Sequence, residues 1–340
     1  MKRVKWLIIC MLWLICWASR GAAQSLGGRQ AFTFLNLPAN ALLNGLGGVG
    51  VSGAGDVSSV WASPALLDST HRNQAALTLA PYLAGAKLST LFYGLPTRKR
   101  WAMGMQYLHY GTMPLTDAAG NELGSFTAAD YALSVAHART EGNITVGATL
   151  KMVGSGIENY QSWAAVADLA AVFKHPKQDF TFGMAVKNAG FFLKRYSPTD
   201  ESELPFDVQL GVTFKPRFMP LRFSITAHHV YQWNIVYNDP ATSFTFDTNG
   251  NRTVKKVSVV ENLARHLVIG TEVLLHKNFR LLLGYNHLRR QEMRLPRGGG
   301  AAGFSVGLLA QTSKFGFSYA YAVQHVAGGL HAVSFRANLN

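Results

Sequence analysis

Bulky apolar residues alternate with small or polar residues along most of the chain after residue 73. Between residues 163 and 173, one face is bulky and the other carries Asp168 among alanines and valines. Residues 180–187 continue the alternation after a short polar turn. Because successive side chains of a strand point to opposite faces, this pattern predicts an antiparallel hairpin in which Phe173 pairs with Phe180.

About 14 such runs follow, most of them close to the roughly 9–11 residues of a membrane-crossing strand. The predicted connections alternate in length along the chain. Short connections are expected at 96–99, 139–143, 175–178, 215–220, 276–278 and 311–314. Longer ones are expected at 111–127, 188–204, 231–265 and 288–300, with smaller members at 81–84, 154–160 and 324–329. Outer-membrane barrels have this asymmetry, whereas a β-sandwich has no reason to sort its loops in this way.

The two faces of the predicted strands differ in a way that favours a membrane. One face is rich in Phe, Leu, Val and Tyr, and the other is rich in Gly, Ala, Ser and Thr. A soluble sheet fills its second face with charged and polar residues, and a basic residue facing lipid costs about 2–4 kcal/mol at the bilayer midplane. We therefore predict an all-β fold: a 14-stranded antiparallel transmembrane β-barrel. A soluble β protein with ordinary core aromatics is the alternative.

The segments before the first strand have different compositions. Residues 1–23 have a basic start, an apolar stretch and small residues ending at Ala23, the layout of a cleaved signal peptide. The apolar stretch of roughly 12 residues is too short for a spanning helix. Residues 24–72 are rich in Gly, Ala and Ser, which suits a plug, or hatch, inside a barrel formed by residues 73–340. An integral outer-membrane location follows from these assignments.

Charge and cysteine content narrow the function classes. The formal net charge is +14, and removing the four basic residues of the first 23 leaves +10. An exported chain rarely meets nucleic acid, so this excess does not indicate a nucleic-acid partner. Cys10 and Cys16 both lie in the predicted signal peptide. Disulfides and thiolate chemistry are therefore excluded from the exported chain.

Asp168 is the one carboxylate on an otherwise small-residue face of its strand. An unpaired buried carboxylate would be costly, so we expect a basic partner in the lumen. Lys187 would lie diagonal to Asp168 if Phe173 pairs with Phe180, and the inserted N-terminal segment is the other possible source. We interpret Asp168 as a structural residue in preference to a proton carrier.

No motif in the chain predicts an enzyme. The sequence 303–307 matches G-x-S-x-G but lies inside a strand pattern, where the serine of that motif does not function. The sequence 48–53 matches G-x-G-x-x-G without a preceding strand. His228 and His229 should point to opposite faces of one strand. We therefore predict no catalytic residues, no cofactor and no metal site; a lipid-modifying enzyme that uses His109 or His137 is a remote alternative.

The predicted loop 288–300 carries four arginines against Glu292 alone. Such a surface suits an acidic partner protein or anionic lipopolysaccharide. The arginines are Arg289, Arg290, Arg294 and Arg297.

Several stretches resemble a known family. They include "FTFLNLPANALLNGLGG", "GDVSSVWASPALL", "LPFDVQLGVTFK" and "GTEVLLHKNFRLLLGYNHLRRQEMR". They are similar to PorQ-type outer-membrane proteins of the type IX secretion system of Bacteroidetes, and more distantly to FadL-like barrels. Ser63-Pro64-Ala65 departs from the Asn-Pro-Ala that related barrels usually have.

The resemblance implies a non-enzymatic barrel with an N-terminal hatch. It would anchor a PorZ-like surface protein of the cargo-attachment complex, with PorU and PorV as indirect partners. The alternative function is that of FadL-like barrels, which transport hydrophobic small molecules. That function requires an apolar tunnel and a lateral opening, and Gly94, Gly104 and Gly147 are candidate positions for the strand kinks that would form it.

Overall fold

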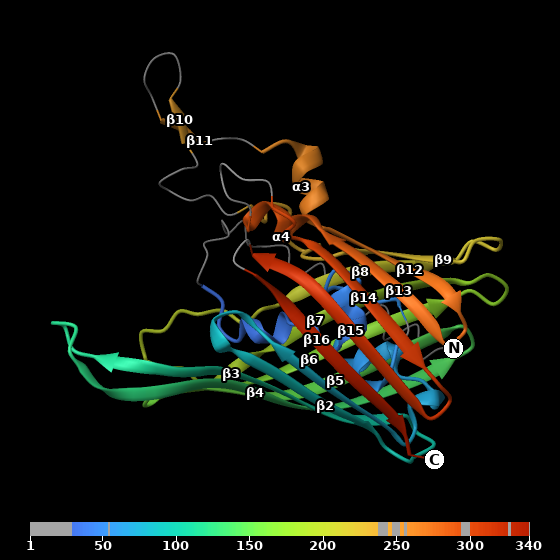
Figure 1. Ribbon diagram of the computed structural model, residues 1–340, viewed down its shortest axis with the longest axis horizontal. Coiled ribbons are helices and arrows are strands. Elements are labelled where there is room, and N and C mark those ends of the chain that lie inside the picture. Colours follow the sequence, from blue (N-terminus) through green and yellow to red (C-terminus); the bar gives the residue numbers. More distant parts are fainter. Residues whose placement is uncertain are drawn as a thin grey trace.

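A closed antiparallel barrel of 14 strands forms the body of the protein (Figure 1). The computed structural model describes residues 29–53, 55–236, 244–246, 252–254, 257–293, 300–325 and 328–339. Each strand pairs with its neighbour in the chain, and β1 closes the barrel against β16. The predicted barrel fold is confirmed, while the predicted signal peptide at residues 1–23 lies outside the described residues.

The barrel strands vary in length, and the longest lie between β3 and β7. Their bounds are β1 Gln74–Pro81, β2 Lys87–Gly94, β3 Trp101–Thr116, β4 Glu122–Glu141, β5 Ile144–Ile157, β6 Tyr160–Lys174, β7 Phe180–Lys194, β8 Asp207–Phe214, β9 Leu221–Ala227, β12 Leu267–His276, β13 Phe279–Asn286, β14 Phe304–Gln311, β15 Phe315–His325 and β16 Gly328–Asn338.

The alternation predicted from the sequence sorts side chains between the lumen and the outer wall. Along β5, Leu150 is 69% exposed and Met152 is 46% exposed, while Thr149 and Lys151 between them are buried. Large apolar side chains are exposed in this way on most strands of the barrel. A continuous apolar outer wall of this extent is unsuited to water and suits hydrocarbon.

The pairing of β6 with β7 differs from the predicted register. Phe173 lies opposite Phe182, not Phe180, because the turn between the strands takes up more residues than expected. Further along, Ala167 pairs with Ala189 whereas Leu169 pairs with Val186, so β7 has an extra residue. This β-bulge reverses the alternation of β7. Beyond it, the odd-numbered positions of β7 face outward.

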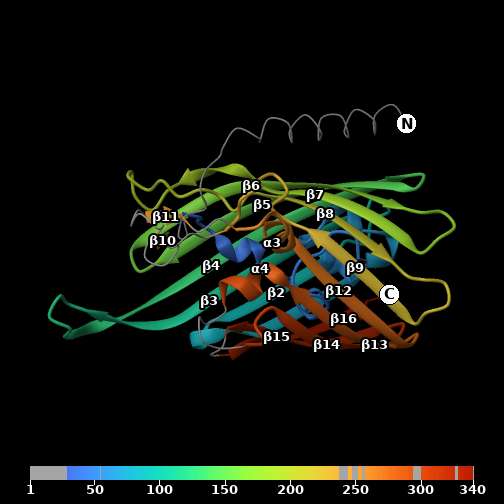
Figure 2. The same cartoon turned by 90° about the horizontal axis from the view of Figure 1, so that it is seen from above.

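An N-terminal segment, residues 29–71, contacts inward-facing side chains on several parts of the barrel wall. The backbone N–H of Ala41 donates to Ser334 Oγ of β16 at 2.8 Å, and Thr90 Oγ1 of β2 donates to the Ala39 carbonyl at 2.7 Å. Ser52 Oγ hydrogen-bonds Thr213 Oγ1 of β8 at 2.8 Å. These partners lie around the barrel, so the segment crosses the lumen (Figure 2). Its short helical pieces are Thr33–Asn36, α2 Ala41–Gly45, Val57–Trp61, Pro64–Leu66 and Ser69–His71.

The connections differ at the two ends of the barrel. At one end they are short, and the C-terminus lies there (Figure 1). At the other end lie the helices α3 Val259–Arg265 and α4 His287–Glu292 and the small strand pair β10 Phe244–Phe246 with β11 Arg252–Val254; a turn of 3-10 helix, Leu83–Gly85, joins β1 to β2. None of the described helices is long and apolar enough to cross a bilayer.

The predicted loop 111–127 is largely strand instead. β3 and β4 continue as a paired hairpin, with Met113 opposite Phe126 and Pro114 opposite Ser125. A bulge between His109 and Thr112 bends the pair, and the hairpin protrudes well beyond the other strands (Figure 1). Alternating apolar and polar residues persist through this segment, so strand pairing extends past the barrel rim.

Candidate functional site

Asp168 is paired in the lumen, and its partner is Lys151 rather than Lys187. Lys151 Nζ lies 2.5 Å from Asp168 Oδ2, and both side chains have no exposed surface. Lys151 comes from β5, where Thr149 lies directly opposite Asp168 of β6. The cation is therefore diagonal to the carboxylate, as we expected of Lys187, but on the preceding strand.

The β-bulge explains why Lys187 is not the partner. Lys187 and Asn188 are the residues that the bulge leaves without partners on β6. Lys187 lies opposite Asp207 of β8. Asn188 adopts a left-handed conformation, with φ 55°, and its backbone N–H donates to Asp168 Oδ1 at 2.8 Å. The Asp168 carboxylate thus binds the backbone of the bulge through Oδ1 and the Lys151 ammonium group through Oδ2.

The same cluster reaches the N-terminal segment. Lys151 Nζ lies 4.4 Å from the centroid of the Trp61 ring, a cation–π contact. It also donates to Asn188 Oδ1 at 3.0 Å, while Asn188 Nδ2 donates to Asn36 Oδ1 at 3.3 Å. Asp168 and Lys151 therefore connect two strands of the wall with the segment that crosses the lumen, which agrees with a structural role.

An apolar groove of about 790 Å³ lies on the outer wall beside this cluster. Outward-facing side chains of β2 to β7 line it: Leu91, Met103, Leu133, Leu150 and Phe191. Its floor includes Gly104, Gly190 and Lys151. A Cβ on Gly190 would lie 2.1 Å from the Ala165 carbonyl oxygen, so glycine permits a close approach of β7 to β6 there.

The three glycines predicted as kink positions have separate roles. Gly104 lines the groove. A Cβ on Gly94 would lie 1.8 Å from the His71 carbonyl oxygen, and one on Gly147 would lie 2.5 Å from the Pro64 carbonyl carbon. Gly94 and Gly147 therefore admit the backbone of the N-terminal segment.

A second cavity, of about 240 Å³, lies between the N-terminal segment and the wall. Arg222, Arg280 and Arg336 line it together with Asp56. Glu272 accepts from Arg222 Nη1 at 3.4 Å and from Arg280 Nη1 at 3.0 Å. Arg222 Nη2 also lies 3.7 Å from Asp179 Oδ2, so Asp56, Glu272 and Asp179 balance the charge of the three guanidinium groups.

The four arginines predicted to contact a partner do not share one environment, and the structure describes two of them. Arg289 is partly buried and lies over the N-terminal segment, with Nη2 3.2 Å from the position of a Cβ on Gly48. Burial lowers the pKa of the Arg289 guanidinium, while the nearby Tyr82 and Glu292 act in the opposite direction. Arg290 Nη1 donates to the Gly300 carbonyl, and Arg290 lies 5.7 Å from the Phe304 ring centroid. Arg294 and Arg297 lie outside the described residues.

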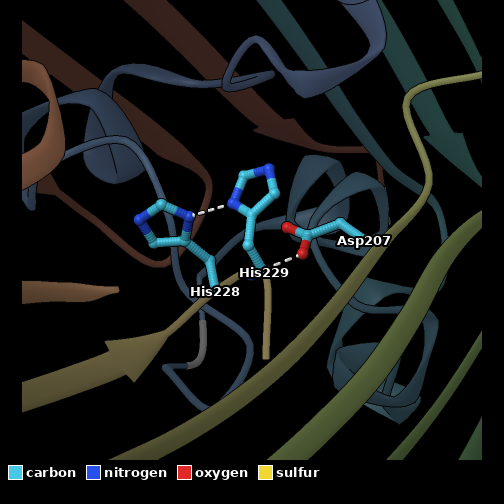
Figure 3. A group of neighbouring side chains, drawn as sticks. All are labelled: Asp207, His228 and His229. Carbon is cyan, nitrogen blue, oxygen red and sulfur yellow. Dashed lines mark hydrogen bonds between the residues drawn. The ribbon is translucent and has the colours of Figure 1, made fainter. Parts of the chain in front are cut away.

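The prediction that His228 and His229 point to opposite faces is wrong. Strand β9 ends at Ala227, and His229 has a left-handed backbone with φ 54°. The two rings therefore converge, with centroids 4.7 Å apart, beside Asp207 of β8 (Figure 3). Within the described residues, these three are a group whose potential ligand atoms all lie within 4.8 Å of one another. Alternation gave no signal of this group, because it depends on where β9 stops.

The serine of the G-x-S-x-G match is used for packing. Ser305 lies in β14 and its Oγ donates to the Gly45 carbonyl oxygen at 3.1 Å. That hydrogen bond joins the wall to α2, and it agrees with our interpretation of the match as part of a strand.

Comparisons with known proteins identify the fold and no family. No protein-family model matches the chain, and no curated protein matches it either. Among solved structures, the toluene transporter TodX of P. putida is similar, with a TM-score of 0.51 and 10% identity over 90% of this chain and 99% of that one. A deltaS2 mutant of the TodX monoaromatic hydrocarbon channel has a TM-score of 0.52 and 11% identity, over 89% and 97% of the two chains. A FadL homologue of Pseudomonas aeruginosa has a TM-score of 0.48 and 11% identity, over 89% of this chain and 98% of that one.

These comparisons favour the more distant part of the predicted resemblance. None of them supports PorQ-type proteins specifically. The chain shares the barrel fold of the FadL-like outer-membrane channels.

Proposed function

We propose that this protein is an outer-membrane barrel that transports hydrophobic small molecules, the alternative that the sequence left open. The observation that carries the proposal is the apolar groove on the outer wall beside the β6–β7 bulge. A compound that partitions into hydrocarbon would find there a concave apolar surface separated from the lumen by one layer of backbone. The similar channel TodX is described as a toluene transporter, which supports a substrate of this class.

The lumen side of the groove offers a place for control of passage. Lys151 belongs both to the groove floor and to the buried pair with Asp168. Moving this pair would break the contact between Lys151 of β5 and Trp61 of the N-terminal segment. We infer that the barrel rests in a closed state held by these contacts.

Uptake of a radiolabelled monoaromatic compound by cells lacking their own carrier tests the proposal. Ala167→Trp places a large ring in the groove, and we expect uptake to fall several-fold toward the background of carrier-free cells. Leu283→Trp is the matched control, because Leu283 is 48% exposed on the outer face of β13 outside the groove. Equal uptake by both variants and the unmodified protein, at equal levels of folded barrel, would contradict a role for the groove.

A second candidate function is the anchoring of a surface protein, such as the PorZ-like partner that the resemblance implies. The protruding β3–β4 hairpin favours this function. Beyond the rim its two strands pair with each other, and their outer edges offer backbone groups and side chains to a partner. Leu123 in this hairpin is 65% exposed. Removing residues 113–125 should release a surface partner in a pull-down while leaving hydrophobic uptake intact. Retention of the partner would count against this function.

A further inference from the structure

His228, His229 and Asp207 form a cluster at the long-loop end of the lumen (Figure 3). His228 Nδ1 and His229 Nδ1 are 2.5 Å apart. In neutral rings whose protons are on Nε2, both Nδ1 atoms have lone pairs directed at each other. A divalent cation would accept both lone pairs after the two nitrogens move apart to roughly 3.3 Å, the spacing that two tetrahedral Zn–N bonds of about 2.0–2.1 Å require.

The surroundings hold the Asp207 carboxylate and the backbone of both histidines in place. Asp207 and His228 are each 3% exposed. Asp207 Oδ1 accepts the backbone N–H of His229 at 2.6 Å, and Oδ2 accepts Gln209 Nε2 at 2.6 Å. His266 Nδ1 donates to the His228 carbonyl at 2.8 Å. Hydrogen bonds of this kind orient ligands in metal sites, where they are needed nearly as much as the ligands themselves.

The backbone at His229 is also unusual. A left-handed conformation is uncommon for residues other than glycine, and it carries a cost that the surrounding structure must offset. Here it turns the His229 ring toward that of His228 instead of to the opposite face. The chain therefore adopts a less favourable backbone in order to bring two imidazoles and a carboxylate together.

We propose that Asp207, His228 and His229 bind a late first-row divalent cation, with Zn²⁺ as the representative ion. Two imidazole nitrogens and one carboxylate oxygen are a donor set that zinc and its neighbours favour. Calcium and magnesium prefer oxygen ligands throughout. Three protein ligands leave one position of a tetrahedral ion for water.

The position of the cluster indicates what the ion would do. Asp207 begins β8, directly after one long connection, and the two histidines begin the next long connection after β9. An ion bound to all three would join the bases of both connections at the mouth of the barrel. Zinc would thereby tie the first residue of β8 to the residues that follow β9.

Zinc titration of the untagged barrel tests the proposal, since a histidine tag would itself bind the ion. The protein is stripped with EDTA, desalted in detergent and titrated with Zn²⁺ against a chromophoric chelator. We expect about one high-affinity ion per barrel. His229→Gly keeps the left-handed backbone and removes a ligand, and Gln209→Leu removes a hydrogen bond to Asp207. Losing the hydrogen-bond partner of a metal ligand typically costs about 10–100-fold in affinity. We expect a loss in that range for Gln209→Leu and a larger one for His229→Gly.

His276→Ala is the matched control, because His276 is exposed at the opposite end of the barrel. Its zinc affinity should equal that of the unmodified protein. Electrophoretic mobility without heating checks that each variant is folded. Zinc affinity unchanged in His229→Gly would overturn the proposal, as would weak binding that all variants share. Cobalt substitution of the unmodified protein requires no variant: intense visible bands of a four-coordinate ion are expected, and a pale six-coordinate spectrum would exclude the site.

Discussion

At the scale of single residues, the lumen of this barrel is organised by buried charges. Asp168 is held by Lys151, by the backbone of Asn188 and, through Lys151, by the Trp61 ring. Removing one member of a buried ion pair leaves the other charge without compensation, which is costlier than the loss of the attraction itself. The pair is therefore expected to determine stability more than any exposed pair in the chain.

Lys151→Met tests this expectation. We predict a loss of about 3–5 kcal/mol in the free energy of unfolding, because the buried Asp168 would lose the cation that lies 2.5 Å from it. Unfolding by urea in lipid vesicles measures it. Lys174→Met is the control: Lys174 and Asp68 are 4.0 Å apart and partly exposed, so its effect should stay below about 1 kcal/mol. The double variant Lys151→Met with Asp168→Leu should recover much of the loss, and failure to recover would contradict the electrostatic explanation.

At the scale of elements, glycines on the inner wall determine how closely the N-terminal segment approaches the strands. Gly147 of β5 lies against the Pro64 backbone, and Gly183 of β7 lies against the Val51 carbonyl oxygen, 2.4 Å from the position of a Cβ. The density of small residues in both partners makes this contact possible. The outer face of the same strands has no such requirement.

Gly147→Leu should displace the N-terminal segment. A side chain at this position overlaps the Pro64 backbone. Overpacking of this kind typically lowers the free energy of unfolding by about 1–3 kcal/mol. Limited proteolysis followed by mass spectrometry should show faster cleavage within residues 55–71. Gly156→Leu on the same strand is the control, since a Cβ there meets nothing within 4 Å. Similar cleavage of the two variants would mean that the segment does not depend on this contact.

At the scale of the whole molecule, the barrel presents apolar side chains outward and encloses its N-terminal segment. A soluble protein has its apolar side chains inside, whereas this barrel has them on its outer wall. Strands with few charged residues suit such a barrel, because their outer face meets hydrocarbon in place of water. The environment of a tryptophan therefore reports whether its ring lies on the outer wall or inside the barrel. Trp101 is 37% exposed, while Trp61 is 1% exposed.

Quenching by brominated lipid should separate these two tryptophans. In variants that retain a single tryptophan, fluorescence of Trp101 should fall strongly in brominated vesicles, because its side chain is exposed on the outer face of β3. Fluorescence of Trp61 should change little, since the wall shields it. Strong quenching of Trp61 or none of Trp101 would be incompatible with the outer wall facing hydrocarbon.

Much of the fold was predictable from the sequence, because the alternation of period two follows directly from strand geometry. It predicted the barrel, the strand number and the lumen position of Asp168, whereas residues 111–127, predicted as a loop, are largely strand. The boundaries of the hatch and barrel segments stay a prediction. The candidate sites were harder to predict from the sequence. Each depends on a place where the alternation of apolar and small residues is interrupted, and the alternation itself does not show where that happens.

The sequence by itself determined which side of each strand meets the lumen, because that choice needs only the order of apolar and small residues. Only the tertiary structure decided which residues meet across strands. Because of the bulge at Asn188, the partner of Asp168 is Lys151 and not the predicted Lys187. The left-handed backbone at His229 brings two histidines together. Register and backbone turns are set by the sum of many contacts along neighbouring strands, so no local pattern of residues specifies them.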